Sequence, residues 1–228
     1  MARAPISVVI PTLNSADELA ACLPTLSEGL NAGLIRELIV SDGGSSDATL
    51  TLAARAGADV VRGPKSRGGQ MGRGCAAAQG AWLLVLHADT QMRDGWSKAV
   101  LDHLKMSSSK AGYFTLQFRA SGFFPRMVAG WAMARSRVFG LPYGDQGLLI
   151  SRALYDQVGG YANIPLMEDV ALARKLRGQL RRLNAVATTS AVKYQRQGWL
   201  KRGALNLLLL VRYLFGADPR DLAREYTR

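Results

Sequence analysis

The sequence has few cysteines and lacks several motifs that identify large enzyme classes. Only Cys22 and Cys75 occur in 228 residues, which argues against a disulfide framework and favours structural thiols in a reducing compartment. No glycine-rich dinucleotide fingerprint follows the first predicted strand, and no Walker lysine motif occurs. These absences disfavour dehydrogenases and P-loop NTPases. Internal repeats and low-complexity segments are also missing.

Acidic residues are scarce relative to basic ones. The chain has 17 Asp and Glu against 29 Lys and Arg, a formal net charge of +12. This excess favours polyanionic partners, which include nucleic acid, an anionic membrane and phosphorylated small molecules. A strand pattern begins directly after Pro5, so we expect no signal peptide and a cytoplasmic protein.

The residues that are present predict a single α/β domain. Hydrophobic residues make up 48% of the sequence, enough for one sizeable core. Apolar and β-branched runs at 6–10, 38–40, 59–62 and 82–86 predict four strands with helices between them. Ser15 and Glu18 have the spacing of a capping box at the first helix. This alternation predicts βαβ units and a mixed, mostly parallel sheet flanked by helices.

The run at 82–86 reads as a central strand that is buried on both faces, followed by His87 and Asp89. Ligands of open α/β sheets bind at the carboxyl edge of the strands, where Asp89 can hold a divalent cation or a ribose hydroxyl. A helix cap is an equally open reading of Asp89. Asp42 ends the second strand at the same edge, and Arg67 lies in a basic loop suited to a diphosphate. Together these residues favour a phosphorylated nucleotide.

The second half predicts further strands at 111–119 and 147–150 and a helix at 170–176 opened by two carboxylates. We expect the main domain to occupy residues 1–200 and an amphipathic helical appendage to occupy residues 201–228. The apolar stretch 205–215 is too short to span a bilayer. Its helix either packs on the domain, forms a homodimer or lies on the inner membrane face, and packing or dimerisation is favoured.

Four segments together resemble a known family. In chain order they are Val8-Val9-Ile10-Pro11-Thr12-Leu13-Asn14, Asp42-Gly43-Gly44-Ser45-Ser46-Asp47, His87-Ala88-Asp89 and Glu168-Asp169. They resemble the ordered motifs of the family 2 inverting glycosyltransferases, which have the GT-A fold. The resemblance spans residues 6 to about 200. It is greatest to a bacterial branch named for arsenosugar biosynthesis and radical-SAM/selenodomain association, through Leu86–Thr90, Gln70-Met71 and Gly144–Gly147.

The resemblance implies a set of donor and metal contacts. It places the nucleotide sugar against Pro11, Thr12, Asn14, Asp42, Arg67, Gln70 and Asp89. It also implies a divalent cation, Mn or Mg, at Asp89. His87 stands where the family's Asp-x-Asp motif has its first aspartate. Two interpretations of His87 remain open: a neutral imidazole that ligates the metal, or a hydrogen-bonded histidine at a strand end.

The resemblance also implies the catalytic residue. Asp169 matches the family's general base, the carboxylate that accepts the proton of the acceptor hydroxyl as the anomeric carbon is attacked in line. On residue type alone, Asp169 is a helix N-terminal acid. Candidates for the acceptor side are Asp145, Glu168, Arg196 and Trp199. Their alternatives are a turn-stabilising aspartate at Asp145 and a solvated basic turn at 195–199.

We therefore expect a bacterial glycosyltransferase that moves a sugar, with inversion and metal assistance, from a nucleotide diphosphate sugar to an unnamed acceptor. One alternative is a catalytically degenerate protein of the same fold that binds nucleotide sugars, because His87 replaces a ligand carboxylate. Another is a basic nucleic-acid-binding module. Its arginines are scattered without interleaved aromatics, so no nucleic-acid partner is expected.

Overall fold

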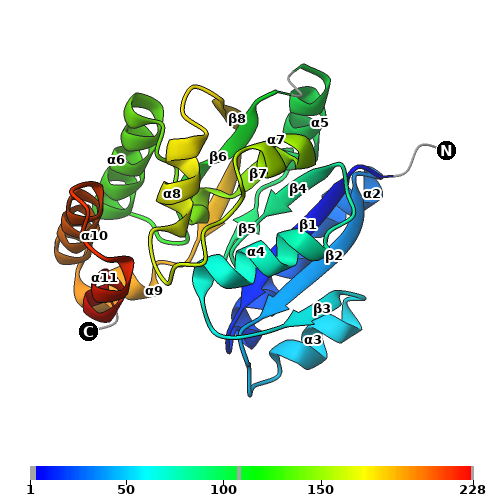
Figure 1. Cartoon of the computed structure of the whole chain (residues 1–228), viewed down its shortest axis with the longest axis horizontal. Coiled ribbons are helices and arrows are strands. Elements are labelled where there is room, and N and C mark those ends of the chain that lie inside the picture. Colours follow the sequence, from blue (N-terminus) through cyan, green and yellow to red (C-terminus); the bar gives the residue numbers. More distant parts are fainter. Residues whose placement is uncertain (1–3, 107–108, 227–228) are drawn as a thin grey trace.

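The computed structural model describes residues 4–106 and 109–226. Residues 1–3, which bear on the expectation about a signal peptide, lie outside the described part, as do 107–108 and 227–228. Eight strands form one sheet in the order β3-β2-β1-β4-β7-β6-β8-β5 (Figure 1). They are β1 (Ile6–Thr12), β2 (Ile35–Asp42), β3 (Asp59–Arg62), β4 (Trp82–Val85), β5 (Gln91–Met92), β6 (Ala111–Phe118), β7 (Leu148–Ser151) and β8 (Leu180–Thr189).

Six of these strands run in one direction. Only β7, which pairs antiparallel with β4 and β6, and the short β5, which pairs antiparallel with β8, run the other way. All four residues of β4 are buried, and β4 lies between β1 and β7. Its alternate residues Trp82 and Leu84 pack into one core cluster, while Leu83 and Val85 pack into another. Burial on both faces explains the unbroken apolar run, and the predicted α/β fold is confirmed.

Helices cover both faces of the sheet. They are α1 (Ala16–Cys22), α2 (Ser27–Asn31), α3 (Thr49–Arg55), α4 (Arg67–Ala77), α5 (Trp96–Met106), α6 (Phe123–Phe139), α7 (Arg152–Gln157), α8 (Glu168–Lys175), α9 (Val192–Gln197), α10 (Trp199–Leu214) and α11 (Pro219–Tyr226). Two 3₁₀ turns, η1 (Leu23–Leu26) and η2 (Gly144–Gln146), complete the elements. In Figure 1, α4, α7 and α8 cross the near face, and α6, α10 and α11 gather at the end opposite β3.

The local predictions hold only in part. The capping box is wrong, because α1 has no side-chain cap and the Ser15 hydroxyl bonds back to Leu13. Asp47, from the next loop, accepts a hydrogen bond from the Ala16 amide instead, at 3.1 Å. Helix α6 and strand β8 were not predicted at all. Exposed apolar side chains on α6 obscure its helical period, and β8 starts with two exposed arginines.

The C-terminal helices pack on the rest of the chain. Helix α10 begins two residues before the predicted boundary at residue 201. Leu209 and Leu210 of α10 and Leu222 of α11 form one buried cluster with Val170 and Ala173 of α8. None of the helices in the described ranges combines the length and apolar character needed to cross a bilayer.

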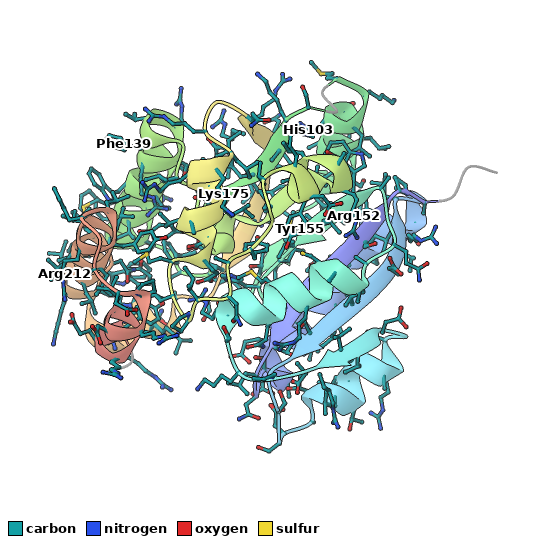
Figure 2. All side chains as sticks on the ribbon, in the orientation of Figure 1. His103, Phe139, Arg152, Tyr155, Lys175 and Arg212 are labelled. Carbon is teal, nitrogen blue, oxygen red and sulfur yellow. The ribbon has the colours of Figure 1, made fainter. Side chains whose placement is uncertain are left out.

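Helix α4 is fixed at both ends. At its carboxyl end the guanidinium of Arg152, labelled in Figure 2, donates to the carbonyl oxygens of Cys75 (2.9 Å) and Ala78 (2.5 Å). At its amino end the Gly68 amide donates to the Ile164 carbonyl at 3.1 Å. A Cβ on Gly68 would lie 2.0 Å from the carbonyl oxygen of Ala162. Only glycine therefore allows α4 to approach the segment that leads into α8.

We expect Gly68→Ala to destabilise the fold by about 1–3 kcal/mol, because the contacted atom is backbone and cannot turn away. Gly72→Ala is the matched control in the same helix. Its Cβ would meet only the Tyr161 carbonyl oxygen at 3.7 Å, so it should be neutral or stabilise by up to ~1 kcal/mol. Urea unfolding of both variants checks the difference. Equal midpoints would contradict the close approach.

Candidate active site

The carboxyl ends of the six co-directional strands lie along one edge of the sheet, and the candidate residues gather there. Asp42 ends β2, His87 and Asp89 follow β4, and Thr189 ends β8. The amino end of α8 carries Glu168 and Asp169 and contacts Arg67 and Gly144. Arg67 in turn contacts His87, which brings this end of α8 to the same edge. This is the edge where α/β sheets bind ligands.

Asp42 is fully buried and saturated with hydrogen bonds. Its Oδ2 accepts from the amides of Gly44 (2.8 Å) and Ser45 (2.9 Å), and its Oδ1 accepts from the hydroxyls of Ser45 (2.5 Å) and Thr12 (3.2 Å). Burial opposes ionisation of Asp42, but these bonds hold its pKa below the usual range. A carboxylate offers about four lone-pair sites, so all are used. Asp42 thus orders the turn after β2, and a base contact would displace one of these donors.

The loop after β1 is joined to that turn. Asn14 has a left-handed backbone (φ 48°). Its side-chain Oδ1 accepts from the Ser46 backbone amide at 2.8 Å, and its backbone amide donates to the Ser45 hydroxyl at 2.8 Å. Pro11 is half-buried at the end of β1. Gln70 is buried, and its amide nitrogen donates to the Thr12 carbonyl at 2.7 Å. Gln70 therefore supports the strand ends from below.

Arg67, His87 and Glu168 form a charged cluster that joins α4, β4 and α8. The Nε atom of Arg67 lies 3.1 Å from Oε1 of Glu168, and its Nη2 lies 3.4 Å from Nε2 of His87. Burial, together with the adjacent Arg67 charge, lowers the pKa of His87 to about 4, so the ring is neutral and accepts from the guanidinium. Burial raises the pKa of Glu168 to about 7 despite Arg67, with Asp169 adding to the rise.

Asp89 is the residue best placed to hold a cation. Its Oδ2 accepts from the Thr189 hydroxyl at 3.1 Å, and its carbonyl accepts from Nη1 of Arg119 at 2.6 Å. Within the described residues, no group of three or more His, Cys, Asp or Glu could hold a metal ion by itself. The donor set therefore fits a cation shared with ligand oxygens. His87 is the other candidate, but ligation through Nε2 would end its contact with Arg67.

Asp169 is fixed by backbone amides. Its Oδ2 accepts from the Gly144 amide at 2.8 Å, and its Oδ1 accepts from Val170 at 2.7 Å. Asp145 is the next residue in the η2 turn. Its buried Oδ1 has no hydrogen-bond partner in the described structure. Burial raises the pKa of Asp145 to about 6 against the opposing charge of Arg135, and Asp169 and Asp89 add to the rise.

The segment at 195–199, a candidate for the acceptor side, lies at the end of α9 and the start of α10. Arg196 is exposed in the last turn of α9 and makes no ion pair in the described residues. Trp199 is half-buried. Its ring stacks on Tyr194 with centroids 4.9 Å apart and meets the edge of Phe118 at 5.1 Å. Trp199 thus belongs to an aromatic cluster.

Several residues of the site were not found from the sequence. Thr189 and Arg119 support Asp89, the Gly144 amide orients Asp169, and Arg135 stacks its guanidinium 3.3 Å from the centroid of the Tyr143 ring. The first two lie at the ends of β8 and β6, so recognising β8 would have placed Thr189 at this edge. A backbone amide leaves no residue-type signal.

Comparison with known proteins identifies related chains. The model of the family described as glycosyl transferase family 2 matches residues 7–137. A curated relative from Mycobacterium bovis, a PGL/p-HBAD biosynthesis glycosyltransferase, is 35% identical over 99 residues. That match covers 40% of this chain and 38% of the relative. The chain therefore spans less than half the length of this relative.

Solved structures are similar in fold. A mannosyltransferase from Pyrobaculum calidifontis, in complex with GDP-Man and Mn²⁺, has a TM-score of 0.69 and 17% identity over 99% of this chain and 70% of its own. A glucosyl-3-phosphoglycerate synthase from Mycobacterium tuberculosis, in complex with Mn²⁺, UDP and glucosyl-3-phosphoglycerate, has a TM-score of 0.56 and 20% identity. Its match covers 90% of this chain and 78% of that one. At these identities the likeness establishes the GT-A fold alone.

The two shifted groups of the charged cluster have opposite effects on stability. The folded state keeps the Glu168 proton up to about pH 7, whereas the unfolded chain releases it near 4.5, so this contribution to stability falls as pH rises. For His87 the unfolded chain binds a proton near 6.5 and the folded state only near 4, so this contribution rises with pH. The two contributions offset each other between about pH 4.5 and 6.5.

We expect Glu168→Gln to remove only the first contribution. The free energy of unfolding of the variant, minus that of the unmodified protein, should increase as pH rises from 4.5 to 7. Urea unfolding at steps of pH measures this difference, with Glu18→Gln, an exposed acid of α1, as the control for lost charge. A difference that does not change with pH would contradict the assignment.

Proposed function

This chain belongs to glycosyl transferase family 2, and we propose that it transfers a sugar from a nucleoside diphosphate sugar to an acceptor hydroxyl, with inversion, using Asp169 as general base. The observation that carries the proposal is the position of the Asp169 carboxylate. Gly144 fixes its Oδ2 at the sheet edge, beside the cluster that contains Arg67 and His87. Each Asp169 oxygen accepts one backbone amide, so the carboxylate keeps free lone pairs for a proton.

The proposed step is a direct displacement. The acceptor oxygen attacks the anomeric carbon and its proton passes to Asp169, while the bond from the anomeric carbon to the diphosphate breaks and the nucleoside diphosphate leaves with the bonding electrons. Arg67 lies at the amino end of α4, where a guanidinium and the helix dipole both favour the growing negative charge. Donor binding would then exchange the Glu168 contact of Arg67 for diphosphate oxygens.

We propose Asp89 as the protein ligand of a Mn²⁺ or Mg²⁺ ion, with His87 as the second candidate. When bound, such an ion supplies charge neutralisation for the leaving diphosphate. Asp89 offers one hard carboxylate oxygen, oriented by Thr189, which suits these ions. The complexes of the mannosyltransferase with GDP-Man and Mn²⁺, and of the synthase with UDP and Mn²⁺, support this proposal.

The remaining assignments stay proposals. Pro11, Thr12 and Asn14, with Asp42, would shape the site for base and ribose, and Gln70 would support it. Asp145 and Glu168 would lie on the acceptor side, together with Arg196 and Trp199 at its outer rim. Residues 1–200 would form the catalytic domain and residues 201–228 its helical appendage. Membership of the arsenosugar-associated branch also stays a prediction.

A degenerate binding protein of the same fold is the second candidate. The observation that favours it is the contact between His87 and Arg67. A neutral imidazole that faces the Arg67 guanidinium stands where the family has a metal-binding carboxylate. Such a site would bind a nucleotide sugar without promoting transfer. Measured turnover separates the two candidates.

We expect Asp169→Asn to lower turnover by about 10²–10⁴-fold while leaving donor affinity nearly unchanged, because the amide keeps the bond from Gly144 but cannot take a proton. Hydrolysis of the donor sugar, with water as acceptor, provides the assay, and calorimetry gives donor affinity. Asp156→Asn, at an exposed position in α7, is the control. Equal hydrolysis by Asp169→Asn and the unmodified protein would remove Asp169 as base.

The metal proposal has its own test. Mn²⁺ should bind weakly alone and should strengthen the binding of UDP or GDP in calorimetric titration, because the nucleotide supplies the missing oxygens. Asp89→Asn should reduce the increase in nucleotide affinity caused by Mn²⁺ by at least tenfold, which corresponds to about 1.4 kcal/mol. Asp94→Asn, exposed in the following loop, should keep it. An equal Mn²⁺ effect in both variants would show that Asp89 is not the ligand.

A further inference from the structure

A pocket opens between α6 and α10, beside the proposed base. Phe118, Trp131, Tyr194 and Leu207 are among its apolar walls, and Arg135, Asp145 and Asn206 also line it. The turn that carries Asp145 begins with Gly144, whose amide anchors Asp169 at 2.8 Å. The pocket therefore adjoins the proposed site of transfer, on the side away from the Asp42 turn.

Three buried polar atoms of this pocket lack hydrogen-bond partners in the described structure. They are Nη2 of Arg135, Oδ1 of Asp145 and Oδ1 of Asn206. Other atoms of two of these side chains have hydrogen-bond partners. Nε of Arg135 donates to the Leu141 carbonyl at 2.9 Å, and Nδ2 of Asn206 donates to the Tyr194 hydroxyl at 2.9 Å. Arg135 is only 8% exposed. Unpaired buried groups are rare in native proteins, and three at one pocket indicate a polar occupant.

The chemistry of these atoms describes that occupant. Asp145 and Asn206 offer acceptors, and Arg135 offers a donor. Hydroxyl groups both donate and accept, so a head group with two or more hydroxyls could pair with all three atoms. Such a head would place one hydroxyl next to the residue pair Gly144 and Asp169.

The mouth of the pocket is apolar. Of the sixteen exposed large apolar side chains in the described residues, eleven lie on α6 or α10, and Phe215 directly follows α10. Trp131 and Leu207, from the two helices, line the pocket and are 55% and 40% exposed. Figure 1 shows α6 and α10 next to each other at the end of the molecule away from β3. An apolar segment leaving the pocket would lie between these helices.

We propose that the acceptor is an amphiphile, a hydroxylated head group carried on an apolar chain or ring. Its head binds Arg135, Asp145 and Asn206, and its apolar part lies between Trp131 and Leu207. This assignment rests on the proposed function for its meaning as an acceptor site, but the binding itself does not require turnover.

Calorimetric titration tests the proposal with three glycosides below any micelle-forming concentration: methyl, phenyl and n-octyl β-glucoside, each with UDP or GDP present. The octyl or phenyl glycoside should bind roughly tenfold or more tightly than the methyl one, because only these bury apolar surface. Equal affinities for all three, or no binding by any, would overturn the proposal.

Variants locate the bound tail. Trp131→Ala removes an exposed side chain from the pocket mouth, and should reduce the preference for the apolar glycosides by at least fivefold. Phe139→Ala is the control, because Phe139 is 63% exposed and does not line the pocket. Figure 2 labels Phe139 at the end of α6. Equal losses in both variants would indicate general adsorption to the apolar face and overturn the assignment.

Further measurements separate the other occupants of this face. Size-exclusion chromatography should give the same oligomeric state for Trp131→Ala and the unmodified protein. A dimer that Trp131→Ala dissociates would assign the face to a second copy and overturn the proposal. Donor hydrolysis by the unmodified protein separates the two proposals. Failure of glycoside binding with intact donor hydrolysis refutes the pocket alone. Intact glycoside binding without any hydrolysis refutes the proposed transfer alone.

Discussion

The arrangement of this protein depends on one contact, the pairing of the half-buried Arg67 with the buried Glu168 beside the neutral ring of His87. These three residues come from α4, the end of β4 and the start of α8, so the contact joins segments that are about a hundred residues apart in the chain. Burying charges is unfavourable unless they are paired, and burial raises the pKa of Glu168 despite the opposing charge of Arg67. The cluster therefore joins α4, the end of β4 and the start of α8. It also keeps the Arg67 guanidinium within reach of a polyanionic ligand.

Sequence reasoning recovered the first half of the sheet well because periodic physical signals mark it. Buried strands such as β4 appear as unbroken apolar runs, and carboxylates at the ends of β2 and β4 mark the carboxyl edge of the sheet. The second half of the fold was harder. Helix α6 presents apolar side chains to solvent, and strand β8 has two exposed arginines after its first residue, so neither shows the expected period. Contacts such as the Gly144 amide on Asp169 depend on tertiary packing and have no local signature.

The roles of individual residues also differ from those their types suggest. Asp42 is saturated by its own turn, Gln70 bonds to strand backbone, and Trp199 packs on Tyr194 and Phe118. Each of these side chains bonds or packs within the protein. Several buried polar atoms have no hydrogen-bond partner in the described structure, among them atoms of Asp145, Arg135 and Asn206 at the pocket between α6 and α10, and both carboxylate oxygens of Glu168. Open hydrogen-bonding capacity thus lies at that pocket and at the start of α8.

The reversed direction of β7 has a consequence for how such an enzyme can change. Because β7 runs antiparallel to β4 and β6, its amino end lies at the active edge, and the η2 turn enters the site just before it. Strands β1 to β4 pair with one another without this turn. Substitutions, insertions or deletions around η2 can therefore reshape this part of the candidate site while the register of β1 to β4 is preserved. The family match, which ends at residue 137, stops before this turn. Related chains can thus diverge along this segment while the pairing of β1 to β4 stays the same.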